Sequence, residues 1–257
     1  MIELKKIYNE DCLITMQKLN GVDCVLTSPP YNTSRKGATD LSTHQCRYEN
    51  YNDSMTDEEY IDWTIRLFDG FDHVLKENGC VLYNVSYSSE NTWMLWNMIS
   101  DIQRKTNFTV ADCIVWKKRS ALPNNVSPNK LTRICEFVFV FCRKNEFATF
   151  NCYKGVTSER KSGQTMYKNV FNFIEAPNND GSCPIHKATY STKLCGKLLL
   201  LYTKEGDVVY DPFMGTGTTA IACHRCKRNW VGSEISKNYC DYANKRIKNE
   251  TSQLSLF

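Results

Sequence analysis

The sequence has no apolar run of the roughly 20 residues that a membrane-spanning helix needs. No apolar signal segment follows the opening stretch Met1 to Lys6. The 13 cysteines are odd in number and scattered, which disfavours a disulfide framework in a chain without an export signal. There is also no internal repeat and no low-complexity tract. These absences exclude membrane-spanning, collagen-like and disulfide-scaffold proteins, and they predict a cytoplasmic location with reduced thiols and no membrane partner.

The chain is long and apolar enough for one large domain, with 257 residues of which 42% are hydrophobic. We therefore expect a single domain over residues 1–257. Its net charge is only +4, but the stretch from Arg104 to Phe171 holds thirteen basic residues and four acidic ones. Such local basicity indicates a surface that faces a polyanion. A solvated lysine-rich loop region would have the same composition, so the charge alone leaves contact with nucleic acid undecided.

Predicted strands and helices alternate along the chain. Hydrophobic patterns predict strands at 22–27, 79–85, 108–116, 134–142, 208–210 and 229–232, and helices at 56–76, 90–102, 192–203 and 218–226. Thr56 and Glu59 have the spacing of a capping box, and Asn78-Gly79 is expected to end that helix. The alternation predicts an α/β fold with a mostly parallel sheet. Residues 120–183 are rich in turn signals and should form irregular functional loops around the strand at 134–142.

A glycine-containing turn, Asp211 to Thr219, lies between a predicted strand and a predicted helix. Gly215 and Gly217 allow the backbone to approach a ligand closely and expose amide groups at the helix N-terminus. Glu234 ends the next strand, where an acid can accept hydrogen bonds from ribose hydroxyls. The full dinucleotide fingerprint is absent, which favours a ligand without a pyrophosphate. A tight turn with no ligand is the alternative.

The tetrapeptide Ser28-Pro29-Pro30-Tyr31 directly follows the predicted strand at 22–27. Its two prolines make the backbone rigid just beyond a strand end, where α/β sheets place their active sites. The Ser28 hydroxyl and the Pro29 carbonyl can together accept both hydrogens of a planar amino group. Tyr31 offers a ring face on which a base can stack. A rigid loop without chemistry is the alternative for an arbitrary Pro-Pro-Tyr sequence.

Together the two motifs resemble those of S-adenosylmethionine-dependent DNA amino-methyltransferases, the N4-cytosine and N6-adenine family. Ser28-Pro29-Pro30-Tyr31 resembles the catalytic tetrapeptide of that family, and Asp211 to Thr219 resembles its cofactor loop. The catalytic motif comes first here, as in the circularly permuted β group of restriction-modification type. The resemblance extends from Ile7 to Ile247. It implies a Rossmann-like methyltransferase fold with a target-recognition region inserted at residues 120–183.

The resemblance also implies roles for individual residues. The catalytic ones would be Ser28, Pro29, Pro30 and Tyr31. The residues that bind S-adenosylmethionine would be Asp11, Cys12, His186, Asp211, Pro212, Phe213, Gly215, Gly217, Thr218 and Glu234. In the segment that contains His186, Lys187 and Ser191 stand where the family commonly has prolines. Double-stranded DNA would be gripped by basic residues, namely Lys117, Lys118, Arg119, Lys130, Arg133, Lys154, Arg160 and Lys161.

In the mechanism that the resemblance implies, the target base leaves the duplex and stacks on Tyr31. Ser28 and the Pro29 carbonyl accept the amino hydrogens as charge develops, and the nitrogen attacks the sulfonium methyl directly. Serine at the first motif position favours cytosine N4 in this family, and adenine N6 is the alternative. Methylation of cytosine C5 is disfavoured, because it needs a thiolate nucleophile, usually in a Pro-Cys pair that is absent here.

Other functions are disfavoured by particular features of the sequence. An RNA or protein-amide methyltransferase would use the same chemistry, but the motif order and the basic insert argue against it. A non-catalytic DNA-binding relative would not need both motifs intact. The stretch Cys223-His224-Arg225-Cys226 lacks a second Cys-x-x-Cys pair, so no metal site is predicted. The sequence leaves open whether a restriction endonuclease is a partner and whether the chain forms a homodimer.

Overall fold

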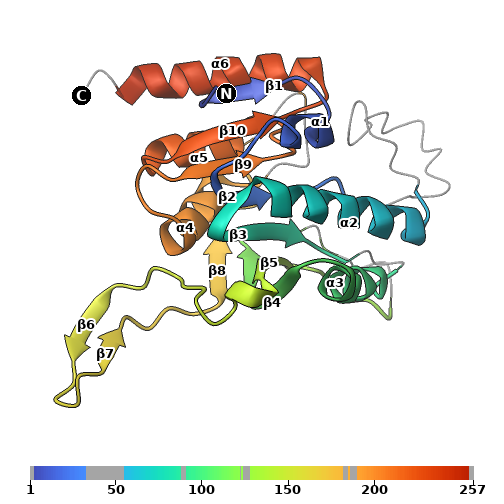
Figure 1. Cartoon of the computed structure of the whole chain (residues 1–257). Helices are drawn as coiled ribbons and strands as arrows, with labels where there is room; N and C mark the ends of the chain where they lie inside the picture. Colours follow the sequence, from blue (N-terminus) through green and yellow to red (C-terminus); the bar gives the residue numbers. More distant parts are fainter. Residues whose placement is uncertain are drawn as a thin grey trace.

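The computed structural model describes residues 3–32, 55–87, 91–121, 123, 128–181, 185 and 190–254. Its strands are β1 (Lys6–Tyr8), β2 (Val22–Thr27), β3 (Leu75–Val85), β4 (Phe108–Lys118), β5 (Cys135–Arg143), β6 (Val156–Glu159), β7 (Thr165–Tyr167), β8 (Phe173–Ala176), β9 (Val208–Asp211) and β10 (Asn229–Ser233). Its α-helices are α1 (Cys12–Met16), α2 (Asp57–Val74), α3 (Met94–Lys105), α4 (Thr192–Tyr202), α5 (Thr218–Arg225) and α6 (Lys237–Leu254). Helices lie on both faces of a central sheet (Figure 1).

The central sheet has eight strands in the order β1-β10-β9-β2-β3-β5-β4-β8. Only β5 runs against its neighbours β3 and β4, and all the other pairings in this sheet are parallel. The predicted α/β fold with a mostly parallel sheet is therefore confirmed. Because the strands run the same way, the carboxyl ends of seven of them and the amino end of β5 meet at one edge, which we call the carboxyl edge. The arrowheads of β1 and β3 point towards this edge in Figure 1.

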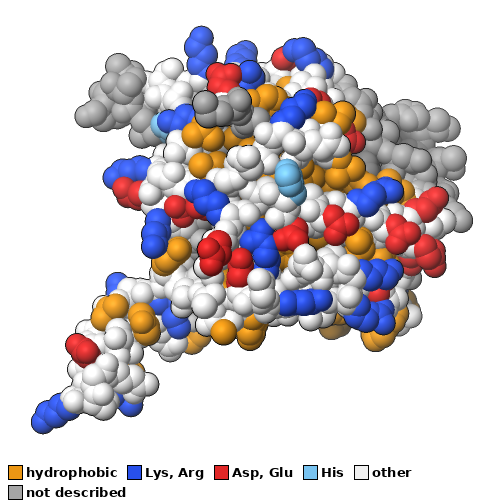
Figure 2. All heavy atoms as spheres, in the orientation of Figure 1, with side chains coloured by type: hydrophobic (Ala, Val, Ile, Leu, Met, Phe, Trp, Pro, Cys, Tyr) orange, Lys and Arg blue, Asp and Glu red, His pale blue; other side chains and the backbone are white. Residues whose placement is uncertain are grey.

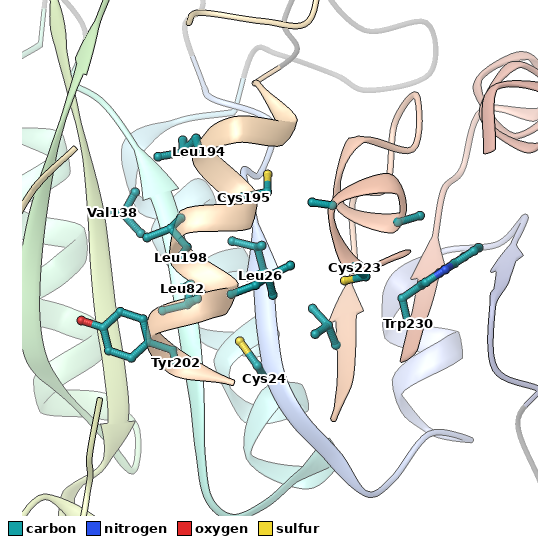
Figure 3. Close-up of a cluster of buried hydrophobic side chains, with 14 of the residues drawn as sticks. Cys24, Leu26, Leu82, Val138, Leu194, Cys195, Leu198, Tyr202, Cys223 and Trp230 are labelled. Carbon is teal, nitrogen blue, oxygen red and sulfur yellow. The ribbon is translucent and has the colours of Figure 1, made fainter. Parts of the chain in front are cut away.

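Alternate residues of the central strands face two separate apolar layers, as expected for a parallel sheet that is covered on both sides. In β2, Cys24 and Leu26 pack with Leu198 of α4, as Figure 3 shows, in a layer that also includes residues of α5 and α6. Val25, which lies between them, faces the layer formed with α1, α2 and α3. Phe68 of α2 is fully buried in that second layer. No helix in the described ranges has the length and apolar character that crossing a membrane requires.

The boundary between α2 and β3 differs from the prediction. The capping box is present, because Thr56 accepts a hydrogen bond from the Glu59 amide and the Glu59 side chain accepts one from the Thr56 amide. The helix, however, already ends at Val74, and Asn78-Gly79 lies inside the long strand β3. Asn78 has a left-handed backbone with φ of 56°. The turn signal was real, but it marks an irregularity within the strand instead of the end of the helix.

The predicted recognition region, residues 120–183, is divided by the structure into three parts. Its first part, from 120 to 134, joins β4 to β5 at the carboxyl edge. The strands β5 and β8 belong to the central sheet. Between them β6 and β7 form a separate two-stranded hairpin, which we call the arm, and it projects away from the body of the molecule (Figure 1). The arm starts at the sheet edge opposite the carboxyl edge, because β5 is antiparallel to the other strands and ends there.

Arg143, at the end of β5, joins three elements on the edge opposite the carboxyl edge. Its guanidinium donates to Asp72 Oδ1 at 2.5 Å, to Glu146 Oε1 at 3.2 Å, and to the backbone carbonyls of Asp72, Leu75 and Lys76 at 2.7–2.9 Å. The side chain is only 14% exposed. The carbonyls that it satisfies lie where α2 passes directly into β3, so they need this donor.

We expect Arg143→Lys to lower the free energy of unfolding by about 2–3 kcal/mol, because a lysine ammonium cannot reach all of these acceptors. Urea denaturation followed by circular dichroism measures this change. Arg104→Lys is the matched control, since Arg104 is 70% exposed and bonds only its neighbour Asp101 among the described residues. The control should change the free energy by less than about 0.5 kcal/mol. Equal effects of the two substitutions would show that Arg143 does not join these elements.

Candidate active site

The carboxyl edge of the sheet collects most of the residues that the sequence singled out. Asp11 follows β1, Ser28 follows β2, Asp211 ends β9 and Glu234 follows β10. The strands β1, β10, β9 and β2 are neighbours in that order. Residues that are about 200 positions apart in the chain therefore lie side by side. The edge combines a rigid tetrapeptide with a glycine turn, as the Rossmann-like prediction requires.

The two motifs are joined by a direct hydrogen bond. The hydroxyl of Thr27, the residue before Ser28, donates to Asp211 Oδ1 at 2.8 Å, and both side chains are buried. The pairing of β2 with β9 brings Val25 opposite Tyr210 and sets this contact. Any ligand held by the turn after Asp211 therefore lies near the group held by Ser28.

The tetrapeptide is held from behind while its first residue stays accessible. Pro29 and Pro30 are buried, and Ser28 is half-buried. The Tyr60 hydroxyl of α2 donates to the Pro30 carbonyl at 2.9 Å, which anchors the segment to the first helical layer. Among the described residues, none donates a hydrogen bond to the Pro29 carbonyl. The Pro29 carbonyl is thus left able to accept a hydrogen bond beside the Ser28 hydroxyl, on a backbone that two prolines make rigid.

Two residues that the sequence did not single out complete the surroundings of Ser28. Asn84 of β3 lies with its Nδ2 3.3 Å from Ser28 Oγ and 2.8 Å from Tyr31 Oη. Glu136 of β5 lies with its Oε2 3.3 Å from Tyr31 Oη. Tyr31 is half-buried, and its hydroxyl is held inside the site. Their signal in the sequence is weak, because each is a single polar residue within an apolar stretch, Asn84 in the predicted strand 79–85 and Glu136 in the predicted strand 134–142.

Asp211 is a buried carboxylate that fixes the glycine turn. Oδ1 accepts from Thr27 and from the Phe213 amide, and Oδ2 accepts from the hydroxyls of Thr219 and Tyr190 at 2.5 and 3.2 Å. Burial raises the pKa of Asp211, and the four donors partly offset this effect. At 1% exposure Asp211 is enclosed by protein donors, so its role in the site is to shape the turn.

The glycine turn joins β9 to α5, as the sequence predicted, but the amides of Gly215 and Gly217 donate within the protein, to Glu234 and to the Met214 carbonyl. Gly215 and Gly217 have left-handed backbones, with φ of 53° and 87°. A Cβ on Gly217 would also lie 3.2 Å from the side chains of Ala243 and Ile247 in α6, so only glycine fits easily. The Thr216 Oγ1 atom is buried and has no hydrogen-bond partner among the described residues. A buried hydroxyl without an internal partner in such a turn can form its hydrogen bond with a ligand.

The other residues of the turn pack or cap. Pro212 is buried, and the Phe213 ring lies 5.5 Å from that of Trp63 in α2. Thr218 begins α5, and its hydroxyl accepts from Arg246 at 3.1 Å. All three lie at the carboxyl edge with Asp211.

Glu234 joins the glycine turn to the end of β10. Its Oε2 accepts from the Gly215 amide at 2.8 Å and its Oε1 from the Ser236 amide at 2.9 Å. Burial raises the pKa of this carboxyl, against the two amides that lower it. Each oxygen has a further lone pair beyond its bond to an amide. Glu234 thus lies beside the glycine turn, at the position for which the sequence predicted a ribose-binding acid.

Asp11 and Cys12 lie next to Glu234. The Glu234 amide donates to the Tyr8 carbonyl at 3.0 Å, which pairs β1 with the end of β10. Asp11 is exposed and caps α1 by accepting from the Leu13 amide at 2.8 Å. Cys12 is buried, and burial raises the pKa of its thiol. Both positions therefore lie beside the predicted ribose site.

His186 lies outside the described residues, but the structure shows where its segment rejoins the fold. Tyr190 bonds to Asp211 and Thr219, and Ser191 caps α4. Asp180, just before the undescribed stretch, forms an ion pair with Arg246 at 2.6 Å. The described residues on both sides of His186 are thus tied to the glycine turn or its neighbouring helices.

The eight predicted DNA-binding residues fall into two groups. Five lie at or near the carboxyl edge, at the end of β4 or before β5, namely Lys117, Lys118, Arg119, Lys130 and Arg133. The other three, Lys154, Arg160 and Lys161, lie on the arm at the opposite edge. Basic side chains are visible at the tip of the arm in Figure 2. The structure therefore does not bring the arm residues together with Ser28, because β5 carries the chain across the sheet between the two groups.

Two cations of the first group are already paired within the protein. Lys118 forms an ion pair with Glu136, and Lys117 forms one with Glu175 at 2.9 Å. Arg119 and Lys130 are exposed. Arg133 donates to the Tyr87 carbonyl and stacks over its ring at 5.3 Å.

Residues 22–245 match the model of the N6/N4 methyltransferase family, described as DNA methylase. The type II methyltransferase M.Cfr9I of Citrobacter freundii is 26% identical over 96% of this chain and 89% of its own. Among solved structures, PvuII DNA methyltransferase, described as cytosine-N4-specific, has a TM-score of 0.71 at 18% identity, over 96% of this chain and 91% of that one. The M1.HpyAVI–SAM complex has a TM-score of 0.63 at 24% identity, over 94% and 98%. The structural likenesses confirm the fold that the sequence predicted.

Proposed function

Because the chain belongs to the DNA methylase family of N6- and N4-methyltransferases, we propose that it methylates N4 of cytosine in duplex DNA, with S-adenosylmethionine as the methyl donor. The observation that carries this proposal is the hydrogen bond from Thr27 to Asp211, which joins the amine-accepting tetrapeptide to the glycine turn. At the carboxyl edge, the glycine turn would thus hold the methyl donor next to the tetrapeptide that would hold the amine.

The residues at the glycine turn fit S-adenosylmethionine. Glu234 would accept hydrogen bonds from the ribose hydroxyls, and Asp11 would lie towards the adenine. The Thr216 hydroxyl, which has no hydrogen-bond partner among the described residues, is available to the ligand, and Gly215 and Gly217 allow the backbone to approach it closely. His186 would contact the methionine end, since its segment rejoins the fold at Tyr190, next to Asp211. When bound, S-adenosylmethionine supplies a methyl group on a positively charged sulfur.

Ser28 and Pro29 would prepare the target amine for attack. An amino group conjugated to a base ring is a poor nucleophile, because its lone pair is delocalised. Acceptance of its two hydrogens by Ser28 Oγ and the Pro29 carbonyl favours a pyramidal nitrogen, and these bonds strengthen as positive charge develops on the nitrogen. The Tyr31 ring would pack against the flipped base. Fixed placement of the amine supplies much of the rate.

The choice of cytosine N4 rests on Ser28, and a direct assay tests it. Labelled S-adenosylmethionine and unmethylated duplex DNA are incubated with the protein, and the nucleosides are then identified by mass spectrometry. N4-methylcytosine is the expected product. N6-methyladenine would overturn the choice of base and keep the mechanism. Binding of S-adenosylmethionine without any DNA product would overturn the proposed DNA substrate.

We place the contact with the target DNA at the carboxyl edge. Arg119 and Lys130 are exposed at this edge, between the end of β4 and the start of β5, where basic residues can bind phosphates. We propose that the first part of the predicted recognition region, 120–134, reads base edges. The arm, with Arg160 and Lys161 in its turn, would contact DNA only beyond the target site. A division of the region 120–183 into these two parts follows from the direction of β5.

Two double substitutions test this placement. Arg119→Ala with Lys130→Ala is expected to raise KM for DNA and to flatten its salt dependence by about two units of the log–log slope. Arg160→Ala with Lys161→Ala removes the same charge from the arm and should change KM for a short duplex by less than roughly threefold. Measurement of KM for duplex DNA at a series of salt concentrations distinguishes the two double variants. A larger effect of the arm pair would move the DNA contact to the arm.

Three further proposals concern a partner enzyme, the oligomeric state and the cellular location. A restriction endonuclease of matching sequence specificity is proposed as a functional partner because of the type II relatives, and a homodimer is proposed only by analogy with the permuted group. Eleven cysteines within the described residues are free thiols, which supports a reducing cytoplasmic location with access to DNA.

A further inference from the structure

A group of polar side chains lies behind Ser28 on the neighbouring strands. Asn84 Nδ2 lies 3.0 Å from Glu136 Oε2 and 2.8 Å from Tyr31 Oη. Tyr31 Oη lies 3.3 Å from both Ser28 Oγ and Glu136 Oε2. Lys118, the last residue of β4, forms an ion pair with the other oxygen of Glu136. A chain of hydrogen bonds therefore runs from Ser28 through Tyr31 to a carboxylate.

Burial of this group is unfavourable for the fold. Asn84 is 1% exposed, and its Oδ1 has no hydrogen-bond partner among the described residues. The side chains of Glu136 and Lys118 are only 13% and 24% exposed. A buried ion pair often gives no more stability than apolar residues of similar size, and an orphaned amide oxygen costs free energy. Stability alone therefore does not account for the presence of these groups beside Ser28.

The carboxylate fixes the direction of the hydrogen bonds. The Tyr31 hydroxyl oxygen lies 3.3 Å from two acceptors, the Glu136 carboxylate and the Asn84 backbone carbonyl. Because a charged acceptor forms the stronger bond, the Tyr31 hydroxyl donates to Glu136. The Tyr31 oxygen is then an acceptor for the hydroxyl hydrogen of Ser28 and for the Asn84 amide. With its own hydrogen directed at Tyr31, Ser28 Oγ keeps a lone pair for a further donor. That donor is the target amine in the proposed reaction.

We infer that Glu136 is a positioning residue for methyl transfer: held by Lys118, it orients the hydroxyls of Tyr31 and Ser28 so that Ser28 Oγ accepts a hydrogen from the target amine. The inference rests on the proposed function. It assigns to Lys118 an internal role in place of the DNA contact that its charge predicted.

Glu136→Gln tests the direction of the hydrogen bonds from Ser28 to residue 136, because glutamine has nearly the same size and shape as glutamate. Lys118 requires an oxygen, so the new amide turns its nitrogen towards Tyr31 and donates to it. Tyr31 then loses its charged acceptor, and its hydrogen goes to Ser28 Oγ or to the Asn84 carbonyl. Since Asn84 Nδ2 also lies 3.3 Å from Ser28 Oγ, donation from both Tyr31 and Asn84 fills the two lone pairs of Ser28 and leaves none for the amine. We expect kcat to fall at least about tenfold, with unchanged affinity for S-adenosylmethionine. Glu175→Gln is the matched control, because Glu175 pairs with Lys117 on the exposed end of β8 and should leave kcat unchanged.

Rescue distinguishes orientation from a general structural effect. With Lys118→Met added to Glu136→Gln, the amide can turn its oxygen to Tyr31, and kcat at saturating DNA should return to within roughly threefold of Lys118→Met alone. Tyr31→Phe removes the hydroxyl that links Ser28 to Glu136. In a protein that already carries Tyr31→Phe, we therefore expect Glu136→Gln to lower kcat by less than about twofold relative to Tyr31→Phe alone.

Two results would overturn the inference. One is a kcat of the Lys118→Met, Glu136→Gln variant no higher than that of Glu136→Gln. The other is an equal decrease in kcat caused by Glu136→Gln in the wild-type protein and in Tyr31→Phe. A wild-type protein that methylates no DNA would instead contradict the proposed function itself. Urea denaturation of each variant identifies any that fail to fold, and the Tyr31→Phe series then decides the matter.

Discussion

Alanine in place of Ser28 is expected to lower kcat for DNA methylation by about 10²–10³, as happens when one hydrogen-bonding group aimed at developing charge is removed. The dissociation constant for S-adenosylmethionine should stay within about twofold of the wild-type value, because the lost bond matters mainly in the transition state. Ser28 is half-buried and lies outside the glycine turn, so its loss leaves Asp211 and Glu234 in place. Single-turnover kinetics and equilibrium binding of S-adenosylmethionine measure the two quantities.

Two further variants make this result specific. Ser28→Cys preserves the size of the side chain but offers only a weak sulfur acceptor, so it should lose most of the same activity. Ser252→Ala removes a hydroxyl from α6 that donates to the Lys248 carbonyl at 2.8 Å, and it should leave kcat unchanged. If Ser28→Ala retained the wild-type kcat, the amine would have to be activated by other groups. An equal loss of cofactor affinity would point to a role for Ser28 in shaping the turn.

The sequence was sufficient to predict six of the eight strands of the central sheet, but not the two short edge strands β1 and β8. The apolar run 22–27 forms β2 with the predicted bounds, since its residues are buried on both faces and a proline pair stops it. The helix capped by Thr56 was predicted from apolar residues at helical spacing and from a capping box, which the structure contains. Asn78-Gly79 was wrongly predicted to end that helix. The two residues indicate only a local left-handed turn, whereas the pairing of β3 with β2 determines that they lie within a strand. The short arm strands had no periodic signal, since β6 is exposed throughout.

The motifs of the site could also be predicted, but not the contacts between elements. Ser28 and the glycine turn carry local backbone signals, namely two prolines and two glycines. Asn84 and Glu136 carry none, because a single polar residue in a strand gains meaning only when its strand lies beside β2. The arm shows the same limit: its charges predicted DNA contact, and only the direction of β5 reveals that they lie at the opposite edge from Ser28.

Asp211→Ala is expected to weaken binding of S-adenosylmethionine by about 100-fold or more and to lower the free energy of unfolding by about 3 kcal/mol. The carboxylate accepts four hydrogen bonds, from Thr27, Phe213, Thr219 and Tyr190. Alanine would remove this acceptor from the Thr27 hydroxyl and the Phe213 amide, and the hydroxyls of Thr219 and Tyr190 would lose it as well but keep their bond to each other. The turn that presents Gly215 and Gly217 would then lose its fixed shape. Calorimetric titration with the cofactor and urea denaturation measure the two losses.

Asp211→Asn separates the shape of the turn from its charge. The amide oxygen can accept from the Phe213 amide and Thr27, while the amide nitrogen can donate to the hydroxyls of Thr219 and Tyr190, which are able to accept. We therefore expect this variant to fold and to bind S-adenosylmethionine within roughly tenfold of the wild type. A loss as large as that of Asp211→Ala would show that the negative charge itself binds the cofactor.

The pH dependence of stability gives an independent check on the same carboxylate. Burial raises the pKa of Asp211, so the native state keeps its proton to higher pH than the unfolded chain does. Within that window the native state binds more protons, and the contribution of Asp211 to stability falls as the pH rises. Asparagine does not titrate. The free energy of unfolding of Asp211→Asn should therefore increase relative to wild type as the pH rises from the acid range towards neutrality, and a constant difference would contradict the burial of a titrating carboxylate at this turn.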